Sequence, residues 1–365
     1  MFILVGTQIG AGILALPYVL ARLGYFWGAV VLFTAAFFSV LTAIMLVEAL
    51  YLSNPNYHYF DLASRYLGGW GRVLVLLMLY AGYGAMLAYV SALGQVMAAT
   101  AQYYGLTGLT NPTLWAVGFW AVVSFAALFG LRSSGAVESI LAFIIVLLVL
   151  TIFVWSIPRS HPYLGKFDLS SFVTAFSVAI FAFYGHGILP ELVRGVRNMG
   201  KTVWAIITAF STVFLLYTLF SYALMGVLGE NMPEIGTLGL SKLLDPDIAF
   251  IGFLFPFLTI VTSFLSAAVA QTDILSEVFR NRLVAWALAV VPALLVYLLG
   301  YSGFVRVIAF ASLGMLAAAG IIPPLVLKRA REEKGRRLTP ISDGLINFTV
   351  LLYSLMFVAT LVASI

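Results

Sequence analysis

Long uncharged hydrophobic runs divide the chain from one end to the other. Stretches without Asp, Glu, Lys or Arg occur at residues 1–21, 23–47, 73–131, 139–158, 169–190, 202–229, 248–272, 283–305, 307–327 and 344–365. About 20 residues span a hydrocarbon core of about 30 Å, so each run is long enough for a transmembrane helix. The run at 73–131 is interrupted by the turn-rich segment "YYGLTGLTNPT" and therefore holds two helices. The pattern predicts an all-α membrane protein with eleven transmembrane helices.

Composition and charge agree with a membrane protein. Hydrophobic residues make up 63% of the 365 residues and charged residues only 9%, whereas soluble domains average roughly 25% charged residues. Of the 19 Lys and Arg residues, fourteen lie in the loops of one side and five in the alternate loops. Because basic loops stay inside, we expect a cytoplasmic N-terminus and an external C-terminus in a multi-pass protein of the cell membrane, surrounded by lipid.

The same observations exclude several classes of function. The net charge of +5 follows from the loop asymmetry, so we expect no nucleic-acid partner. Cysteine is absent, and so is a His-Glu-x-x-His motif, which leaves no disulfide framework, thiol nucleophile or protease-type zinc site. We therefore expect that the protein is not an enzyme and has no resident cofactor.

The first hydrophobic segment contains "GTQIGAGILALPY" (Gly6–Tyr18), which is unusual for a membrane helix because glycine and proline weaken the helical hydrogen-bond ladder. Part of it, "GAGILALP" from Gly10, recurs as "GHGILP" from Gly185. The copies fall in helices one and six, which predicts two inverted five-helix halves at residues 1–157 and 167–328. An eleventh helix at 340–365 completes a single 1–365 transporter domain. A chance recurrence of common residues is the alternative interpretation.

An unwound helix in lipid exposes backbone groups that need partners, so the two breaks predict a ligand site near the middle of the membrane. We expect the N–H groups that begin the second half-helix to bind a carboxylate. They belong to Gly10, Ala11 and Gly12. We expect the freed carbonyls to accept hydrogen bonds from an ammonium group or to coordinate a cation. They belong to Thr7, Ile9, Phe181 and Ala182. A ligand with both groups is an amino acid.

These motifs resemble the amino acid/auxin permease family of the amino acid–polyamine–organocation superfamily. "GTQIGAGILALPY" is similar to the first-helix motif of that family and of the related hydroxy and aromatic amino acid permeases. Further similar segments are "YFDLASRYLGGWGR", "FAFYGHGILPELVRGVRNM" and "YALMGVLGENM", and the resemblance extends from Gly6 to about Met232. It implies the fold of the bacterial leucine transporter, with a substrate site between helices one, three, six and eight.

The resemblance also implies coupling to sodium or protons. Its sodium ligands fall on the carbonyls of Gly6, Ile9 and Thr259 and on the hydroxyls of Thr262 and Ser263. Hydroxyl residues that merely pack within a membrane helix are the alternative. Some proton-coupled relatives have a lysine on helix five, which is absent from 139–158 here. This absence favours sodium without excluding protons.

Other polar and aromatic residues add candidates. The resemblance places pocket walls near Tyr83 and Phe181, and Tyr184 is a further wall candidate. His186 lies inside the second break, where it could change protonation during transport or fill a polar gap as a neutral side chain. Glu48 and Glu191 lie near cytoplasmic helix ends, where we expect ion pairs with Arg65, Arg194 or Arg197, or solvation.

Together the residues predict a secondary active transporter: a monomeric, cation-coupled symporter of neutral amino acids that works by alternating access. The alternatives are a proton-coupled or exchange-type carrier, and an amino acid sensor that transports nothing. Only Met1–Val5 precede Gly6, about 7.5 Å of helix. Relatives have a longer first half-helix, which indicates a start placed late or a shortened chain with a leaky inner gate.

Overall fold

The computed structural model describes residues 2–129, 135–244, 246–276 and 279–364, and these residues form helices and connections without a strand. The first half of the chain holds α1 Phe2–Gln8, α2 Gly12–Ala21, α3 Gly24–Ser53, α4 Tyr59–Leu67, α5 Trp70–Tyr103, α6 Pro112–Leu128 and α7 Gly135–Ser156. The second half holds α8 Leu169–Ala182, α9 Leu189–Val196, α10 Met199–Leu228, α11 Gly236–Ser241, α12 Pro246–Ser276, α13 Arg282–Leu298, α14 Phe304–Met315, α15 Ile322–Lys334 and α16 Asp343–Ser364.

Within the described residues, seven helical segments are long and apolar enough to cross a membrane. They are Gly24–Ser53, Trp70–Tyr103, Leu169–Val196, Met199–Asn231, Ala249–Ser276, Phe304–Lys334 and Asp343–Ala363. Four shorter apolar helices occupy the positions of the other predicted segments: Gly12–Ala21, Pro112–Leu128, Phe143–Arg159 and Arg282–Leu298. The protein is therefore an all-helical integral membrane protein. A count of eleven crossing helices and the inverted repeat remain predictions.

Side-chain caps begin several of the helices. Asn111 accepts the N–H of Thr113 before α6, and Asn198 accepts the N–H of Lys201 before α10, both at 2.9 Å. Such caps give partners to backbone donors that the first helical turn leaves free. Polar residues in the loops thus determine where the apolar helices start.

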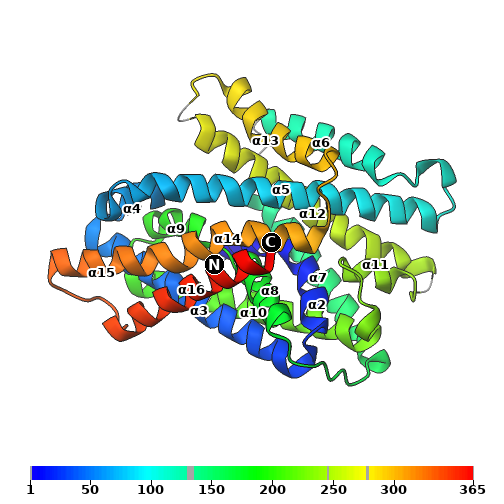
Figure 1. Cartoon of the computed structure of the whole chain (residues 1–365), viewed down its shortest axis with the longest axis horizontal. Helices are drawn as coiled ribbons and strands as arrows, with labels where there is room; N and C mark the ends of the chain where they lie inside the picture. Colours follow the sequence, from blue (N-terminus) through cyan, green and yellow to red (C-terminus); the bar gives the residue numbers. More distant parts are fainter. Residues whose placement is uncertain (1, 130–134, 245, 277–278, 365) are drawn as a thin grey trace.

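Helix α5 runs along the whole molecule, with α6 and α13 on one side of it and α3, α10 and α16 on the other (Figure 1). Of the broken segments, helices α2 and α8 lie mostly in the interior. Helix α2 packs against α8, α10 and α3, and α8 packs against α3, α14 and α16. Interior helices need not show an apolar stripe, and these are apolar on nearly every side.

A short π-helical segment, Leu316–Ile321, joins α14 to α15 and has a cause in the sequence. Pro323 and Pro324 follow it and lack N–H groups, so carbonyls one turn earlier lose their helical partners. The Tyr59 hydroxyl donates to the carbonyl of Ala318. This hydrogen bond joins helix α4 to the point where the helical ladder of α14–α15 is weakened.

Glu48 forms a buried ion pair that holds three elements together. Its carboxylate accepts two hydrogen bonds from the Arg331 guanidinium of α15, at 2.8 and 2.7 Å. It also accepts from the Leu338 N–H at 2.9 Å and from the Thr339 hydroxyl. The expectation that Glu48 would pair with Arg65, Arg194 or Arg197 is wrong, because Arg331 comes from a helix far away in the sequence.

Substitution Glu48→Gln should strongly destabilise the protein. It leaves the buried Arg331 charge without its buried partner, with only the half-exposed Asp343 carboxylate at 3.6 Å, and breaking a buried pair costs about 3–5 kcal/mol. Thermal unfolding in detergent measures the effect. Glu333→Gln is the matched control, since the Arg65–Glu333 pair is well exposed, and it should change little. Equal melting temperatures for the two variants would contradict this role.

Candidate functional site

Two membrane helices are interrupted where the sequence predicts. Helix α1 ends at Gln8, residues 9–11 are not helical, and α2 begins at Gly12. Helix α8 ends at Ala182, residues 183–185 are not helical, and a single 3₁₀ turn at His186–Ile188 leads into α9. The two repeats of the glycine motif thus both coincide with real breaks.

The breaks touch through their backbones. A Cβ atom on Gly12 would lie 2.9 Å from the Cα and 3.1 Å from the Cβ of Ala182. A Cβ atom on Gly10 would lie 2.6 Å from the Ser263 hydroxyl oxygen of α12. Because the atom that a Cβ on Gly12 would meet is backbone, Gly12 is needed for the close approach of the two breaks, whereas at Gly10 the Ser263 side chain would have to move.

Tyr217 and Gln8 connect the breaks by hydrogen bonds. The hydroxyl of Tyr217, on α10, donates to the carbonyl of Gln8 at 2.6 Å and to that of Ala182 at 3.0 Å. The side-chain amide of Gln8 donates to the carbonyl of Phe183 at 2.9 Å. Neither residue was among the site residues predicted from the sequence. A glutamine inside an apolar run was an available signal, whereas nothing distinguishes Tyr217 among 18 tyrosines.

Helix α12 reaches the first break through Ser263. Its hydroxyl accepts the N–H of Ala11 at 2.9 Å, and it interacts with the hydroxyl of Tyr89 on α5. The Thr262 hydroxyl donates to carbonyls of its own helix, at 2.9 Å to Leu258 and at 3.1 Å to Thr259. Among the sodium ligands expected on α12, Ser263 is therefore the one that the described contacts connect directly to the first break.

The crossing of the two breaks holds buried polar atoms without partners among the described residues. They are the Tyr184 hydroxyl, Nδ1 of His186 and Oε1 of Gln8. Tyr184 stacks on His186 with ring centroids 5.8 Å apart, and Nε2 of His186 lies 2.9 Å from the Thr42 hydroxyl of α3. An unsatisfied buried polar group costs about 1–3 kcal/mol. Three such groups, one from the first break and two from the second, are suited to a polar ligand.

The remaining predicted site residues take different positions. The Tyr83 hydroxyl donates to the Leu288 carbonyl of α13 at 2.9 Å. Pro292, four residues after Leu288, has no N–H that could donate to this carbonyl. Phe181 is 8% exposed, and its carbonyl accepts the Tyr184 N–H at 3.2 Å. Ile9 donates its N–H to Val5 at 2.9 Å, and open space surrounds Gly6. Thr7 is exposed at the surface of α1.

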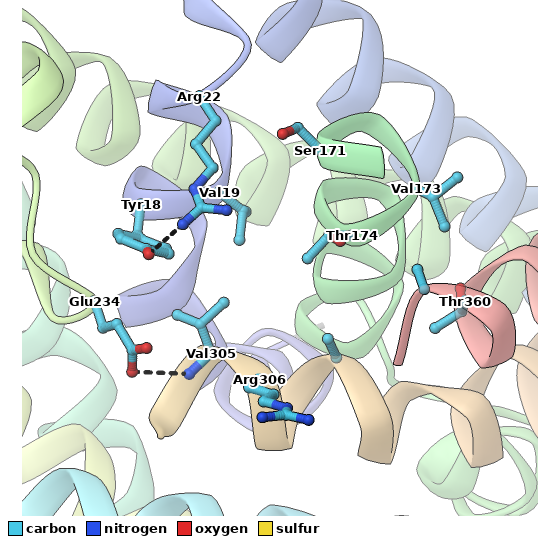
Figure 2. Close-up of a pocket in the computed structure, with 12 residues that line it drawn as sticks. Tyr18, Val19, Arg22, Ser171, Val173, Thr174, Glu234, Val305, Arg306 and Thr360 are labelled. Atoms are coloured by element: carbon cyan, nitrogen blue, oxygen red, sulfur yellow. Dashed lines mark hydrogen bonds between the residues drawn. The ribbon is translucent and has the colours of Figure 1, made fainter. Parts of the chain in front are cut away.

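A cavity of about 320 Å³ lies between the end of α2 and the start of α8. Figure 2 shows α2, α8, α14 and α16 around it, with Arg22 extended toward Tyr18 and Glu234 facing the backbone of Val305. Arg22 donates to the Tyr18 hydroxyl at 2.5 Å. A second cavity, of about 270 Å³, lies where α3 and α9 end and is lined by Tyr51, Pro55, Asn56, Arg194 and Arg197.

The model of the tryptophan/tyrosine permease family matches residues 1–363. The chain belongs to the tryptophan/tyrosine permease family. The broader resemblance to the amino acid/auxin permease family named a different family, whereas the similarity of the first-helix motif to aromatic amino acid permeases pointed toward this one. A permease is a membrane transport protein, so the expectation that the chain is a transporter and not an enzyme is confirmed.

Individual relatives agree with this family. The low affinity tryptophan permease of Escherichia coli strain K12 is 26% identical over 388 residues, covering 97% of this chain and 92% of that protein. The tyrosine-specific transport system 1 of Haemophilus influenzae is 23% identical over 352 residues, covering 89% and 86%. The crystal structure of MhsT in complex with L-phenylalanine superposes with a TM-score of 0.70 at 16% identity, covering 100% of this chain and 98% of that one. The chain therefore shares the leucine-transporter fold.

Substitution Gly12→Ala should weaken substrate binding about tenfold or more while the protein stays folded, because it pushes the two breaks apart; tenfold corresponds to about 1.4 kcal/mol. Binding of labelled substrate by purified protein measures this effect. Gly195→Ala on α9 is the control, because a Cβ there meets nothing within 4 Å. Unchanged binding by the Gly12 variant would exclude this crossing from the site.

Proposed function

We propose that this permease carries an aromatic amino acid, tryptophan or tyrosine, into the cell together with a cation. The observation that carries the proposal is the contact between the two helix breaks, with unpaired buried polar atoms beside it, in a member of this family. The names of the relatives support the substrate class. The aromatic lining around Tyr184 and Phe181 suits an aromatic side chain.

The substrate's main-chain groups would bind at the breaks. The carboxylate takes the positive end of α2, at Gly10, Ala11 and Gly12, where Ser263 now accepts the Ala11 N–H. The ammonium group would donate hydrogen bonds to backbone carbonyls. The candidate carbonyls are those of Thr7, Ile9, Phe181 and Ala182. On α5 we propose Tyr89, not Tyr83, as the residue beside this site. Tyr89 interacts with Ser263, whereas the Tyr83 hydroxyl donates to a carbonyl of α13.

The coupling cation in this proposal is sodium, held by oxygens of Gly6, Ile9, Thr259, Thr262 and Ser263. The oxygens of Thr262 and Thr259 lie 3.1 Å apart, and Ser263 is already in contact with the first break. A proton is the competing coupling ion, and buried His186 is its candidate carrier. An exchange-type carrier would use the same substrate site without either gradient.

The two cavities suit alternating access. One lies at the end of α2 and the start of α8, and the other at the end of α9, so they approach the broken helices from opposite ends. We assign the first to the outside, following the basic residues of the loops, in a monomer of the cell membrane with the N-terminus inside. Rocking of the two halves would then open one approach while the other closes.

Uptake of labelled tryptophan and tyrosine into proteoliposomes tests the proposal. An imposed sodium gradient, an imposed proton gradient and no gradient are compared. We expect labelled tryptophan and tyrosine to accumulate only when the sodium gradient is imposed. An uncharged labelled sugar is the control solute and should not accumulate. Accumulation with the proton gradient alone would replace sodium by a proton. Binding without uptake in any condition would indicate a sensor and contradict the transport proposal.

Substitution Ser263→Ala should reduce sodium-driven uptake about tenfold, because it leaves the Ala11 N–H unpaired at a cost of about 1–3 kcal/mol. Thr212→Ala is the matched control, since that hydroxyl donates only to Thr208 of its own helix. The apparent sodium affinity of both variants distinguishes an ion-site role from a packing role. Wild-type sodium dependence in the Ser263 variant would remove this residue from the cation site.

A further inference from the structure

The cavity where α3 and α9 end brings two arginines together. Its volume is about 270 Å³, several times the roughly 30 Å³ that one water molecule takes up. The lining residues in the described part of the chain include no acidic side chain; they are Tyr51, Pro55, Asn56, Arg194 and Arg197. Two positive charges that share one cavity repel each other, and an anion between them offsets this repulsion. The cavity therefore suits an anion.

Arg194 has a buried donor without a partner. Its Nη1 is shielded from solvent and makes no hydrogen bond to any described residue. Glu191 lies one turn earlier on α9, yet the ion pairs among the described residues include neither Glu191 nor the two arginines. A buried charged donor without an acceptor is costly. An acceptor bound in the adjoining cavity would satisfy it.

The backbone at Arg197 is strained in a way that keeps its side chain beside Arg194. Among the described non-glycine residues, Arg197 alone has a positive φ, of 51°. It caps the C-terminus of α9, a position at which glycine or asparagine is usual. Its N–H donates to the Val193 carbonyl at 2.9 Å, and its Nε donates to the Arg194 carbonyl at 3.2 Å. Backbone strain of this kind is concentrated at functional sites.

The donors of the cavity indicate which anion fits. The Thr202 hydroxyl donates to the Asn198 carbonyl at 2.9 Å, so the Tyr51 hydroxyl, 3.2 Å away, donates to Thr202 and its proton is occupied. The side-chain donors that remain are the two guanidinium groups and the Asn56 amide. A carboxylate has only two oxygens for these donors, whereas a phosphate group has up to four. Planar guanidinium groups bind phosphate oxygens in pairs.

We propose that Arg194, Arg197 and Asn56 form a binding site for a phosphate group. The orientation proposed for the chain puts this cavity at the cytoplasmic membrane surface, where the group comes from an anionic phospholipid headgroup or from free phosphate. Asn56 follows α3 and both arginines belong to the end of α9, so a bound phosphate joins these two elements. It would hold the second half of a broken helix against α3. The inference does not depend on the proposed substrate or coupling ion.

The melting temperature of the purified full chain in detergent tests the proposal. Inorganic phosphate and dihexanoyl phosphatidic acid are titrated separately against potassium chloride at constant ionic strength, with dihexanoyl phosphatidylcholine as the zwitterionic control lipid. We expect a saturable rise, because a ligand that binds only the folded state stabilises it by mass action. A rise with inorganic phosphate identifies the free ion, and a rise with phosphatidic acid alone identifies the headgroup. No saturable rise with either would overturn the proposal, and no variant is needed for this result.

Substitutions of the arginines locate the site. Arg194→Gln and Arg197→Gln should each weaken phosphate binding about tenfold or more, since each removes charge-assisted hydrogen bonds. Arg336→Gln is the matched control, because it removes one positive charge from an exposed position on the same side. Equal dissociation constants for the Arg194 and Arg336 variants would show that phosphate binds elsewhere and would contradict the site.

Arg197→Gly separates binding from loss of stability. Glycine takes a positive φ without strain, so this variant should melt in potassium chloride at about the wild-type temperature or above it. Its affinity for phosphate should nevertheless fall about tenfold or more. Wild-type affinity would overturn the role of the Arg197 side chain. These measurements require no transport, so a failure of uptake in proteoliposomes would contradict the proposed function and leave this site untouched.

Discussion

The crossing of the two broken helices is the interaction on which the rest of the structure depends. Gly12 and Ala182 meet backbone to backbone, and a side chain at Gly12 would separate them. The close approach leaves carbonyls at two helix ends, which a bilayer interior cannot satisfy with water. Tyr217 and Gln8 supply the donors, and Ser263 fixes the first break to α12.

The same constraint explains several tyrosines elsewhere in the membrane. Pro292 frees the Leu288 carbonyl of α13, and the Tyr83 hydroxyl donates to it. The prolines after the π segment weaken the ladder near Ala318, and Tyr59 donates there. In each case an aromatic hydroxyl from another helix restores a bond that the interrupted helix lost, so an interruption in one helix also determines what packs against it.

Local sequence patterns predicted the helices and both breaks well. Uncharged runs correspond to the described apolar helices, and the repeated glycine motif marks the positions where α1 and α8 end. Backbone conformation at Gly10 or Gly185 depends on residues close by, and for this reason it can be inferred from the chain alone. Membership in the family also agrees with the first-helix motif, although the broader family assignment was wrong.

The partners of these local features could not be predicted, because they come from distant segments. Glu48 meets Arg331 and Gln8 meets Phe183, across separations that depend on how whole helices pack. Tyr83 and Tyr89 lie on one helix and have similar sequence surroundings. However, the Tyr83 hydroxyl donates to a carbonyl of α13, whereas Tyr89 lies beside Ser263. Which aromatic residue reaches the breaks is decided by helix rotation, which an apolar sequence does not specify.

Protection of a single introduced cysteine tests the substrate site between the breaks most directly, since the natural chain has none. Gly187→Cys places a thiol beside Tyr184, and Gly195→Cys on α9 is the control, in open space. We expect tryptophan or tyrosine to slow maleimide labelling at 187 but not at 195, in protein that still takes up substrate. Unchanged labelling at 187 during active uptake would contradict a site at this crossing.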